Sequence, residues 1–152
     1  MQYWLVKSEP DECGIDDFVA AGQASIRWDG VRNYQARNFL RQMAVGDRVF
    51  LYHSSCRHIG IAGELEVITE SYPDPTQFDE NSPYVDEKSR LDDPRWSAVD
   101  LVLVEKWPAI LPLNTLKLHA AALTGLQVIA KGARLSVMPV AHEHWQVIQG
   151  LR

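Results

Sequence analysis

Short strand-like segments, spread along the whole chain, are the feature that most constrains its fold. Each is rich in aromatic and β-branched residues and is bounded by turn-forming residues, which predicts strands. The predicted strands are Tyr3 to Lys7, Arg48 to His53, Ile59 to Glu70, Val99 to Val104 and Leu135 to Met138. About five to six strands with helices at the edges predict an α+β fold, in which a compact β-barrel or strongly bent sheet is flanked by short helices.

Two of these strands are expected to differ in how many of their faces are buried. In the segment from Ile59 to Glu70, apolar residues alternate with glutamates, which predicts one buried and one exposed face. The residues expected on its buried face are Ile59, Ile61, Leu65 and Val67. The segment from Val99 to Val104 is apolar on both faces apart from Asp100, which predicts a strand covered on both sides.

Three helices are predicted around the strands, at Ile15 to Ala21, about Asn33 to Met43, and Ala141 to Gln149. In the second helix, Asn33 is a good N-cap because its side-chain oxygen can accept an otherwise free backbone N–H. The apolar residues of this helix share one face, so its basic residues should point outward. The residues expected on the buried face are Ala36, Phe39, Leu40 and Met43.

The composition is that of an ordinary globular chain, but its charge is unevenly distributed. The 152 residues suffice for one domain with a buried core, 46% are apolar, and no apolar run approaches the roughly 18 residues of a membrane span. The formal net charge is −5, yet residues 27–48 hold five arginines against two aspartates, and residues 64–105 hold twelve acids against three bases. One small basic region favours a compact anionic ligand over a long track along duplex DNA.

Two further features bear on location and organisation. Cys13 and Cys56 show neither a CxxC spacing nor a disulfide pattern, and the N-terminus lacks the basic segment of a secretory signal, so we expect a reduced, cytoplasmic setting. Residues 72–95 contain four prolines, many acids and few aliphatic residues, which predicts a long acidic loop. Connections of this length are usually functional or are tethered insertions.

The segment from Trp28 to Arg41 carries the densest group of functional side chains. It places an indole, a glycine, three arginines and the asparagines Asn33 and Asn38 at the entry to the second predicted helix. Stacking of a base on an aromatic face contributes about 1–3 kcal/mol, and an asparagine can hydrogen bond a base edge. A lone tryptophan is more often a core residue, but the polar side chains that follow Trp28 favour a ligand wall.

Two polar tripeptides lie at the ends of predicted strands. Lys7-Ser8-Glu9 ends the first strand and Tyr52-His53-Ser54 ends another. Strand ends in a small barrel converge on one mouth, so both tripeptides could face a shared pocket. Ordinary polar residues at strand ends are an equally good interpretation.

Catalytic and metal-binding arrangements find no support in the sequence. Ser8 or Ser54 with His53 lacks the local context of a nucleophile elbow. His142 and His144 would lie about 200° apart on the predicted helix and could not bind one ion together. Phosphate-binding and dinucleotide-binding glycine motifs are absent. We therefore expect a non-catalytic protein with no metal or other cofactor.

Several motifs resemble, in order, those of the EVE domain. The matching residues are 3–10, 28–41, 52–54, 60–63, 72–74, 77–78, 96–97 and 134–136. The chain resembles a stand-alone bacterial form close to the thymocyte nuclear protein family. The resemblance implies a single domain over residues 1–152 with a PUA-like fold. It also implies non-catalytic binding of a modified base, with 5-methylcytosine or an oxidised form in DNA as the leading ligands.

The resemblance also implies a pocket for that base. Its residues would be Lys7, Ser8, Glu9, Trp28, Asp29, Gly30, Arg32, Asn33, Asn38, Tyr52, His53 and Ser54. We interpret Trp28 as the stacking surface and Asn33 or Ser8 as readers of the base edge. Glu9 or Asp29 could accept a hydrogen bond from an exocyclic amine, as carboxylates do from cytosine N4.

Outside the pocket, Arg37 and Arg41 would contact flanking phosphates, which provide position rather than identity. Two other functions remain open at this point. The protein could read a modified base in RNA, as YTH relatives do, or could be a sensor of a small planar ligand or a protein adaptor. Nucleic acid is the expected partner, without a membrane, and a monomer is favoured.

Overall fold

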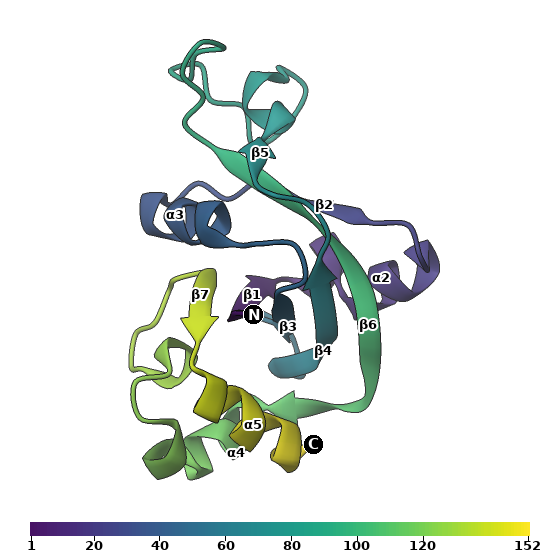
Figure 1. The fold of residues 1–152 in the computed structure, drawn as a ribbon, viewed down its shortest axis with the longest axis vertical. Helices are drawn as coiled ribbons and strands as arrows, with labels where there is room; N and C mark the ends of the chain where they lie inside the picture. Colours follow the sequence, from purple (N-terminus) through teal and green to yellow (C-terminus); the bar gives the residue numbers. More distant parts are fainter.

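The computed structural model describes residues 1–152 and is built around one mixed sheet of seven strands (Figure 1). The strands are β1 (Tyr3–Ser8), β2 (Ile26–Trp28), β3 (Arg48–His53), β4 (Gly60–Val67), β5 (Tyr72–Pro73), β6 (Ser97–Pro112) and β7 (Val137–Val140). Their order across the sheet is β2-β6-β4-β3-β1-β7, with β5 paired to β6. β1 and β3 pair in parallel, and the other neighbours pair antiparallel.

Short helices connect and cover the strands. The α-helices are α1 (Pro10–Cys13), α2 (Ile15–Ala21), α3 (Tyr34–Gln42), α4 (Leu113–Leu118) and α5 (His142–Leu151), and the 3-10 helices are η1 (Pro75–Phe78), η2 (Ala120–Leu123) and η3 (Gln127–Ile129). In Figure 1, α3 lies to the left of the strands and α2 to their right, and α4 and α5 lie together at the end that holds the C-terminus. None of these helices has the length and apolar character needed to cross a membrane.

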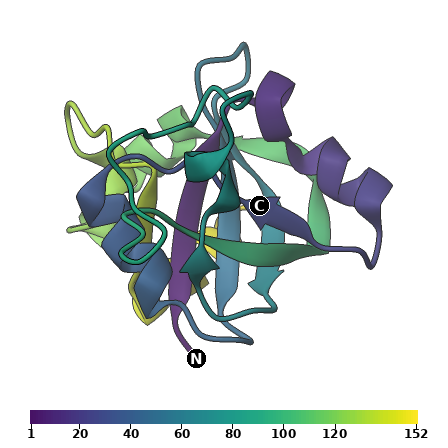
Figure 2. The ribbon, with the colours of Figure 1, turned by 90° about the horizontal axis from the view of Figure 1, so that it is seen from above.

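The sheet separates two hydrophobic cores. In β1, Trp4 and Val6 belong to the first core, which α2 and α3 cover, whereas Leu5 belongs to the second, which α4 and α5 cover. This alternation follows from the period of two along a strand. The sheet curls into a half-barrel flanked by short helices, which confirms the predicted α+β, PUA-like fold (Figure 2).

β4 departs from the simple alternation predicted for it. Ile61 packs in the second core, whereas Leu65 and Val67 pack in the first. The pairing of β3 with β4 skips Ala62, which is a bulge that moves all later side chains to the other face. Ile59 lies before the strand and is 39% exposed, so the prediction of a single buried face was wrong.

β6 is longer and less covered than predicted. It runs from Ser97 to Pro112. The second half was not predicted as a strand because it contains prolines and charged residues, which are uncommon in strands. Val99 and Leu101 are fully buried, but Val104 is 41% exposed. The prediction of a strand covered on both sides was therefore wrong. In its first half, β6 presents Val99 and Leu101 to the first core and leaves Val104 partly exposed. In its second half, Trp107 and Leu111 pack in the second core.

The helix after Trp28 is confirmed. α3 is capped by Asn33, whose Oδ1 accepts the Ala36 N–H at 2.9 Å, and Ala36, Leu40 and Met43 are buried beneath it. α2 and α5 also form where they were predicted, although α5 extends to Leu151. The strand β2 directly before the Trp28 segment was not predicted.

Residues 72–95 fold into a compact projection, called here the acidic lobe, rather than a featureless loop (Figure 1). The fully buried Gln77 organises its interior. Its Nε2 donates to the carbonyls of Asp74 and Trp96 at 2.6 and 2.9 Å, and its Oε1 accepts from Ser89 Oγ and Trp96 N at 2.5 and 3.1 Å. With all its hydrogen bonds made, this amide can be buried at little cost.

Candidate functional site

A cavity of about 570 Å³ opens where the end of β1, the turn after β2, the loop before β7 and the acidic lobe meet. Its volume lies within the range of small-molecule sites. Eight of the predicted pocket residues line it, namely Lys7, Ser8, Glu9, Trp28, Asp29, Gly30, Arg32 and Ser54. Residues from separate parts of the sequence therefore share one concave surface.

Trp28 belongs both to the core and to the cavity wall. It is 6% exposed and its ring stacks on Phe18, with centroids 6.4 Å apart and planes at 26°. It also lines the cavity. Its indole N–H has no hydrogen-bond partner in the protein and, unlike that of Trp107, is not buried. The cavity is therefore bordered by part of an indole, rather than by a fully exposed ring face.

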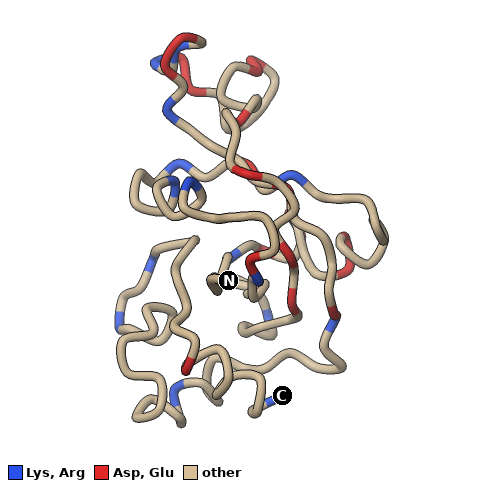
Figure 3. The backbone as a smooth tube through the Cα atoms, viewed as in Figure 1, with Lys and Arg blue, Asp and Glu red and all other residues tan.

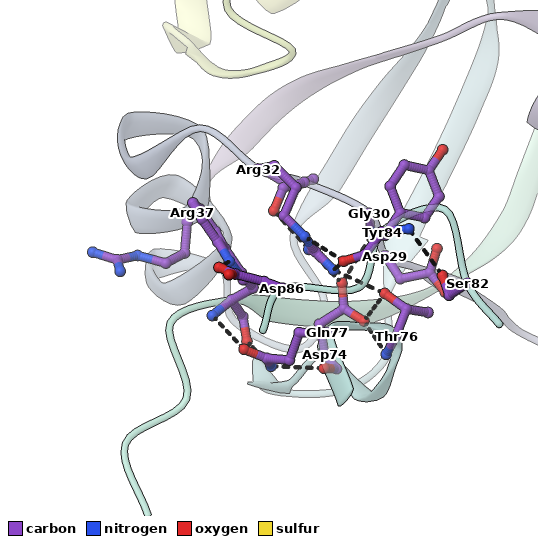
Figure 4. A network of polar contacts seen from close by, with 12 residues as sticks. Asp29, Gly30, Arg32, Arg37, Asp74, Thr76, Gln77, Ser82, Tyr84 and Asp86 are labelled. Atoms are coloured by element: carbon purple, nitrogen blue, oxygen red, sulfur yellow. Dashed lines mark hydrogen bonds and ion pairs between the residues drawn. The ribbon is translucent and has the colours of Figure 1, made fainter. Parts of the chain in front are cut away.

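The turn after Trp28 is tied to the acidic lobe through one carboxylate (Figure 4). Asp74 Oδ2 accepts the Gly30 N–H at 2.8 Å and a guanidinium N–H of Arg32 at 3.0 Å, while Oδ1 accepts from Thr76 N and Oγ1 at 2.8 and 2.6 Å. Burial of Asp74 opposes its ionisation, but the hydrogen bonds from Thr76, Gly30 and Arg32 outweigh this and hold its pKa below the usual value. The rim of the cavity is thus fixed by an ionised, fully buried group.

Four predicted pocket residues do not line the cavity. Asn33 is engaged as the cap of α3, and Asn38 lies exposed, accepting from the Arg37 guanidinium. Tyr52 is buried in the second core. His53 is 7% exposed and its Nε2 accepts the Ile15 N–H at 3.1 Å, which places it beneath α2.

Lys7 lines the cavity, but its ammonium is directed elsewhere. Along β1, Lys7 falls on the same side as Leu5, toward the second core. Its Nζ lies 5.5 Å from the centroid of the Tyr52 ring. Ser8, the next residue, falls on the side of the first core and is the better-placed polar group of this tripeptide.

The two arginines predicted to contact phosphate are held against the end of the lobe. An Arg37 guanidinium nitrogen donates to the Arg95 carbonyl at 2.9 Å, and Arg41 Nε donates to Ser97 Oγ at 2.9 Å. Neither is paired with a carboxylate, so their charges are not neutralised locally. Figure 3 shows basic positions along α3 and several acidic positions in the lobe next to it.

Residues outside the predicted set complete the cavity, among them Glu12, Cys13, Tyr84, Arg134 and Ser136. Arg134 is exposed and forms no hydrogen bond or ion pair within the protein. Burial, with nearby carboxylates, raises the pKa of Cys13 to about 11, so its thiol is protonated and unreactive. Arg134 and Ser136 belong to the EVE-like motif at 134–136, so there was a reason in the sequence to consider them. No feature of the sequence marked Tyr84 as a site residue.

A half-barrel of this topology, with a polar cavity at its strand ends, defines a PUA-like domain. The chain belongs to the EVE domain family, whose sequence model matches residues 2–151. Human thymocyte nuclear protein 1 is 42% identical over 164 residues, which cover 98% of this chain and 73% of the human protein.

Solved structures show the same relationship. A crystal structure of a Pseudomonas putida protein has a TM-score of 0.94 and 53% identity, covering 98% of each chain. The structure of human THYN1 in complex with DNA containing 5-methylcytosine has a TM-score of 0.91 and 38% identity, covering 99% of this chain and 97% of the human one.

Proposed function

We propose that this protein binds a modified nucleobase in DNA, 5-methylcytosine or an oxidised form of it, and does not catalyse a reaction. The observation that carries the proposal is the cavity beside Trp28, whose lining joins an indole to polar side chains such as Glu9 and Arg134. The structure of the human relative with methylcytosine-containing DNA supports the class of ligand. A base would have to leave the duplex to enter, which requires a few kcal/mol that contacts in the cavity must offset.

The geometry separates the roles within the cavity. Asp29 is paired with Arg27 at 2.9 Å, whereas Glu9 is exposed at the rim and has no partner in the protein. Glu9 is therefore the better acceptor for an exocyclic amine, as carboxylates accept from cytosine N4. Ser8 replaces Asn33 as the proposed reader of the base edge, because the oxygen of Asn33 is used in capping α3.

Phosphate contacts would come from more than one surface. Arg37 and Arg41 are orientated by backbone and serine oxygens and keep uncompensated charge, which suits contact with a phosphate. Arg134 has no internal partner and lines the cavity itself. We propose that Arg134 contacts the phosphate of the nucleotide whose base enters.

Fluorescence anisotropy with matched oligonucleotides tests the function. The strands differ at one position, carrying cytosine, 5-methylcytosine or 5-hydroxymethylcytosine, and an RNA set of the same sequences separates a DNA reader from an RNA reader. Tighter binding to a modified DNA is expected, and Glu9→Gln should reduce it. Glu87→Gln is the matched control, since Glu87 is exposed on the lobe and does not line the cavity.

Glu9→Gln is preferable to Trp28→Ala, because removing a core tryptophan costs about 3–5 kcal/mol of stability and could unfold the protein. Equal binding of modified and unmodified DNA by the wild-type protein would exclude the proposed function. A preference that appears only in the RNA set would replace DNA with RNA as the ligand.

A further inference from the structure

Tyr84 reaches the cavity from the acidic lobe, far along the chain from the other aromatic residue of its wall. It lines the cavity together with Trp28, and it packs directly on Gly30. A Cβ atom at residue 30 would lie 2.8 Å from the Cε2 and Cζ atoms of the Tyr84 ring. The absence of a side chain at Gly30 is therefore what allows the ring to occupy this place.

The backbone of Tyr84 is held in position by the rim of the cavity. Two guanidinium nitrogens of Arg32 donate to the Tyr84 carbonyl at 3.0 and 2.6 Å, and the guanidinium lies 5.7 Å from the ring centroid. The Tyr84 N–H donates to Ser82 Oγ at 3.1 Å. Arg32 is itself paired with the buried Asp74. Tyr84 is thus prepositioned, so little ordering is needed when a ligand binds.

The Tyr84 ring lines the cavity, and its hydroxyl is unpaired. The residue is half-buried, and its hydroxyl forms no hydrogen bond within the protein. Figure 4 shows the hydroxyl pointing away from the lobe residues that surround its backbone. Tyrosine combines a large rigid apolar surface with one polar group, which suits contact with a flat heterocycle.

We propose that Tyr84 is a base-contacting residue of this cavity, resting on the proposed function: its ring is the wall against which the bound heterocycle packs. The acidic lobe is then part of the binding site rather than a neutral insertion. Trp28 presents only part of its indole, so a second aromatic surface supplies apolar contact that Trp28 cannot. The ligand class that fits is a planar base.

Anisotropy with the cytosine and 5-methylcytosine oligonucleotides tests this inference on Tyr84→Ala, Tyr84→Phe and the neighbouring control Val85→Ala. Val85 is 37% exposed and does not line the cavity. Tyr84→Ala should weaken binding of the modified DNA about 5- to 150-fold, the range for losing one base–aromatic contact. Tyr84→Phe keeps the ring and should retain most of the affinity, and Val85→Ala should match wild type. All three variants should melt close to wild type.

The outcomes distinguish this inference from the proposed function. If Glu9→Gln loses the preference for modified DNA while Tyr84→Ala binds like wild type, the role of Tyr84 is refuted and the function stands. A Tyr84→Phe variant as weak as Tyr84→Ala would also overturn the role of the ring. If wild type binds both DNAs equally, the proposed function fails. In that case an unchanged shared affinity in Tyr84→Ala refutes the inference as well, and a reduced one supports contact with an unmodified base.

Discussion

Replacing Asp74 with asparagine should destabilise the protein far more than replacing any other acidic residue of the lobe. Its side chain is fully buried and accepts four hydrogen bonds, including one from the partly exposed Arg32. An asparagine is neutral and turns one of the acceptors into a donor that faces other donors. It also leaves the Arg32 guanidinium without its counter-charge.

The size of the effect follows from that arrangement. Removing one partner of a buried ion pair costs about 3–5 kcal/mol, a large part of the roughly 5–15 kcal/mol that stabilises a typical domain. Asp92→Asn is the control, because Asp92 pairs with Arg90 across side chains that are 68% and 72% exposed. Exposed pairs contribute at most about 1 kcal/mol. Urea unfolding followed by tryptophan fluorescence gives both free energies of unfolding.

The pH dependence gives a second measurement of the same group. Because the pKa of Asp74 is lowered in the folded state, its contribution to stability is complete above the ordinary aspartate pKa of about 4 and is lost as the pH falls through the folded value. Wild type and Asp74→Asn should therefore converge in stability in acid. Equal free energies of unfolding for Asp74→Asn and Asp92→Asn at pH 7 would refute the role of Asp74 in holding the rim of the cavity.

Two further predictions concern a buried histidine and a cavity arginine. Burial lowers the pKa of His53, with Asp16 opposing, so the folded state keeps the imidazole neutral and stability should fall as the pH drops below about 6.5. His53→Gln should flatten the difference between free energies of unfolding at pH 7.5 and 5.5, and an unchanged difference would assign it to other groups. Arg134→Gln should lower the slope of log affinity against log salt by about 1, with little change in preference among bases. Arg90→Gln, on the lobe, should leave that slope unchanged. An equal reduction of the slope in both variants would contradict a specific phosphate contact by Arg134.

Local patterns in the sequence predicted the elements that depend on neighbouring residues. The cap and buried face of α3 follow from the order of residues 33–43, because helix capping and amphipathic spacing act within a few positions. The strands β1 and β3 follow from short apolar segments. The bulge at Ala62 could not be predicted from the sequence, because nothing in the alternating segment marks where the pairing with β3 shifts.

The same distinction holds for the cavity. The segment around Trp28 and the polar residues Ser8 and Glu9 were recognised as site residues by their chemistry and by resemblance to the EVE domain, and the structure places them on one surface. Asn33 was predicted both to cap α3 and to line the pocket, and its oxygen is used by the cap. The pocket prediction for His53 did not anticipate that its Nε2 accepts a backbone N–H of α2. A polar residue type does not reveal which partner it will find.

Sequence alone therefore determined the fold class, the family and the segment that borders the cavity, because these are recorded in local spacing and in the order of motifs. Tertiary structure alone decided that the acidic lobe contributes Tyr84 to the cavity wall and that Asp74 holds Gly30 and Arg32. Those contacts join residues more than forty positions apart. Their geometry depends on how the sheet curls and how the lobe packs, and neither is encoded within a short stretch of chain.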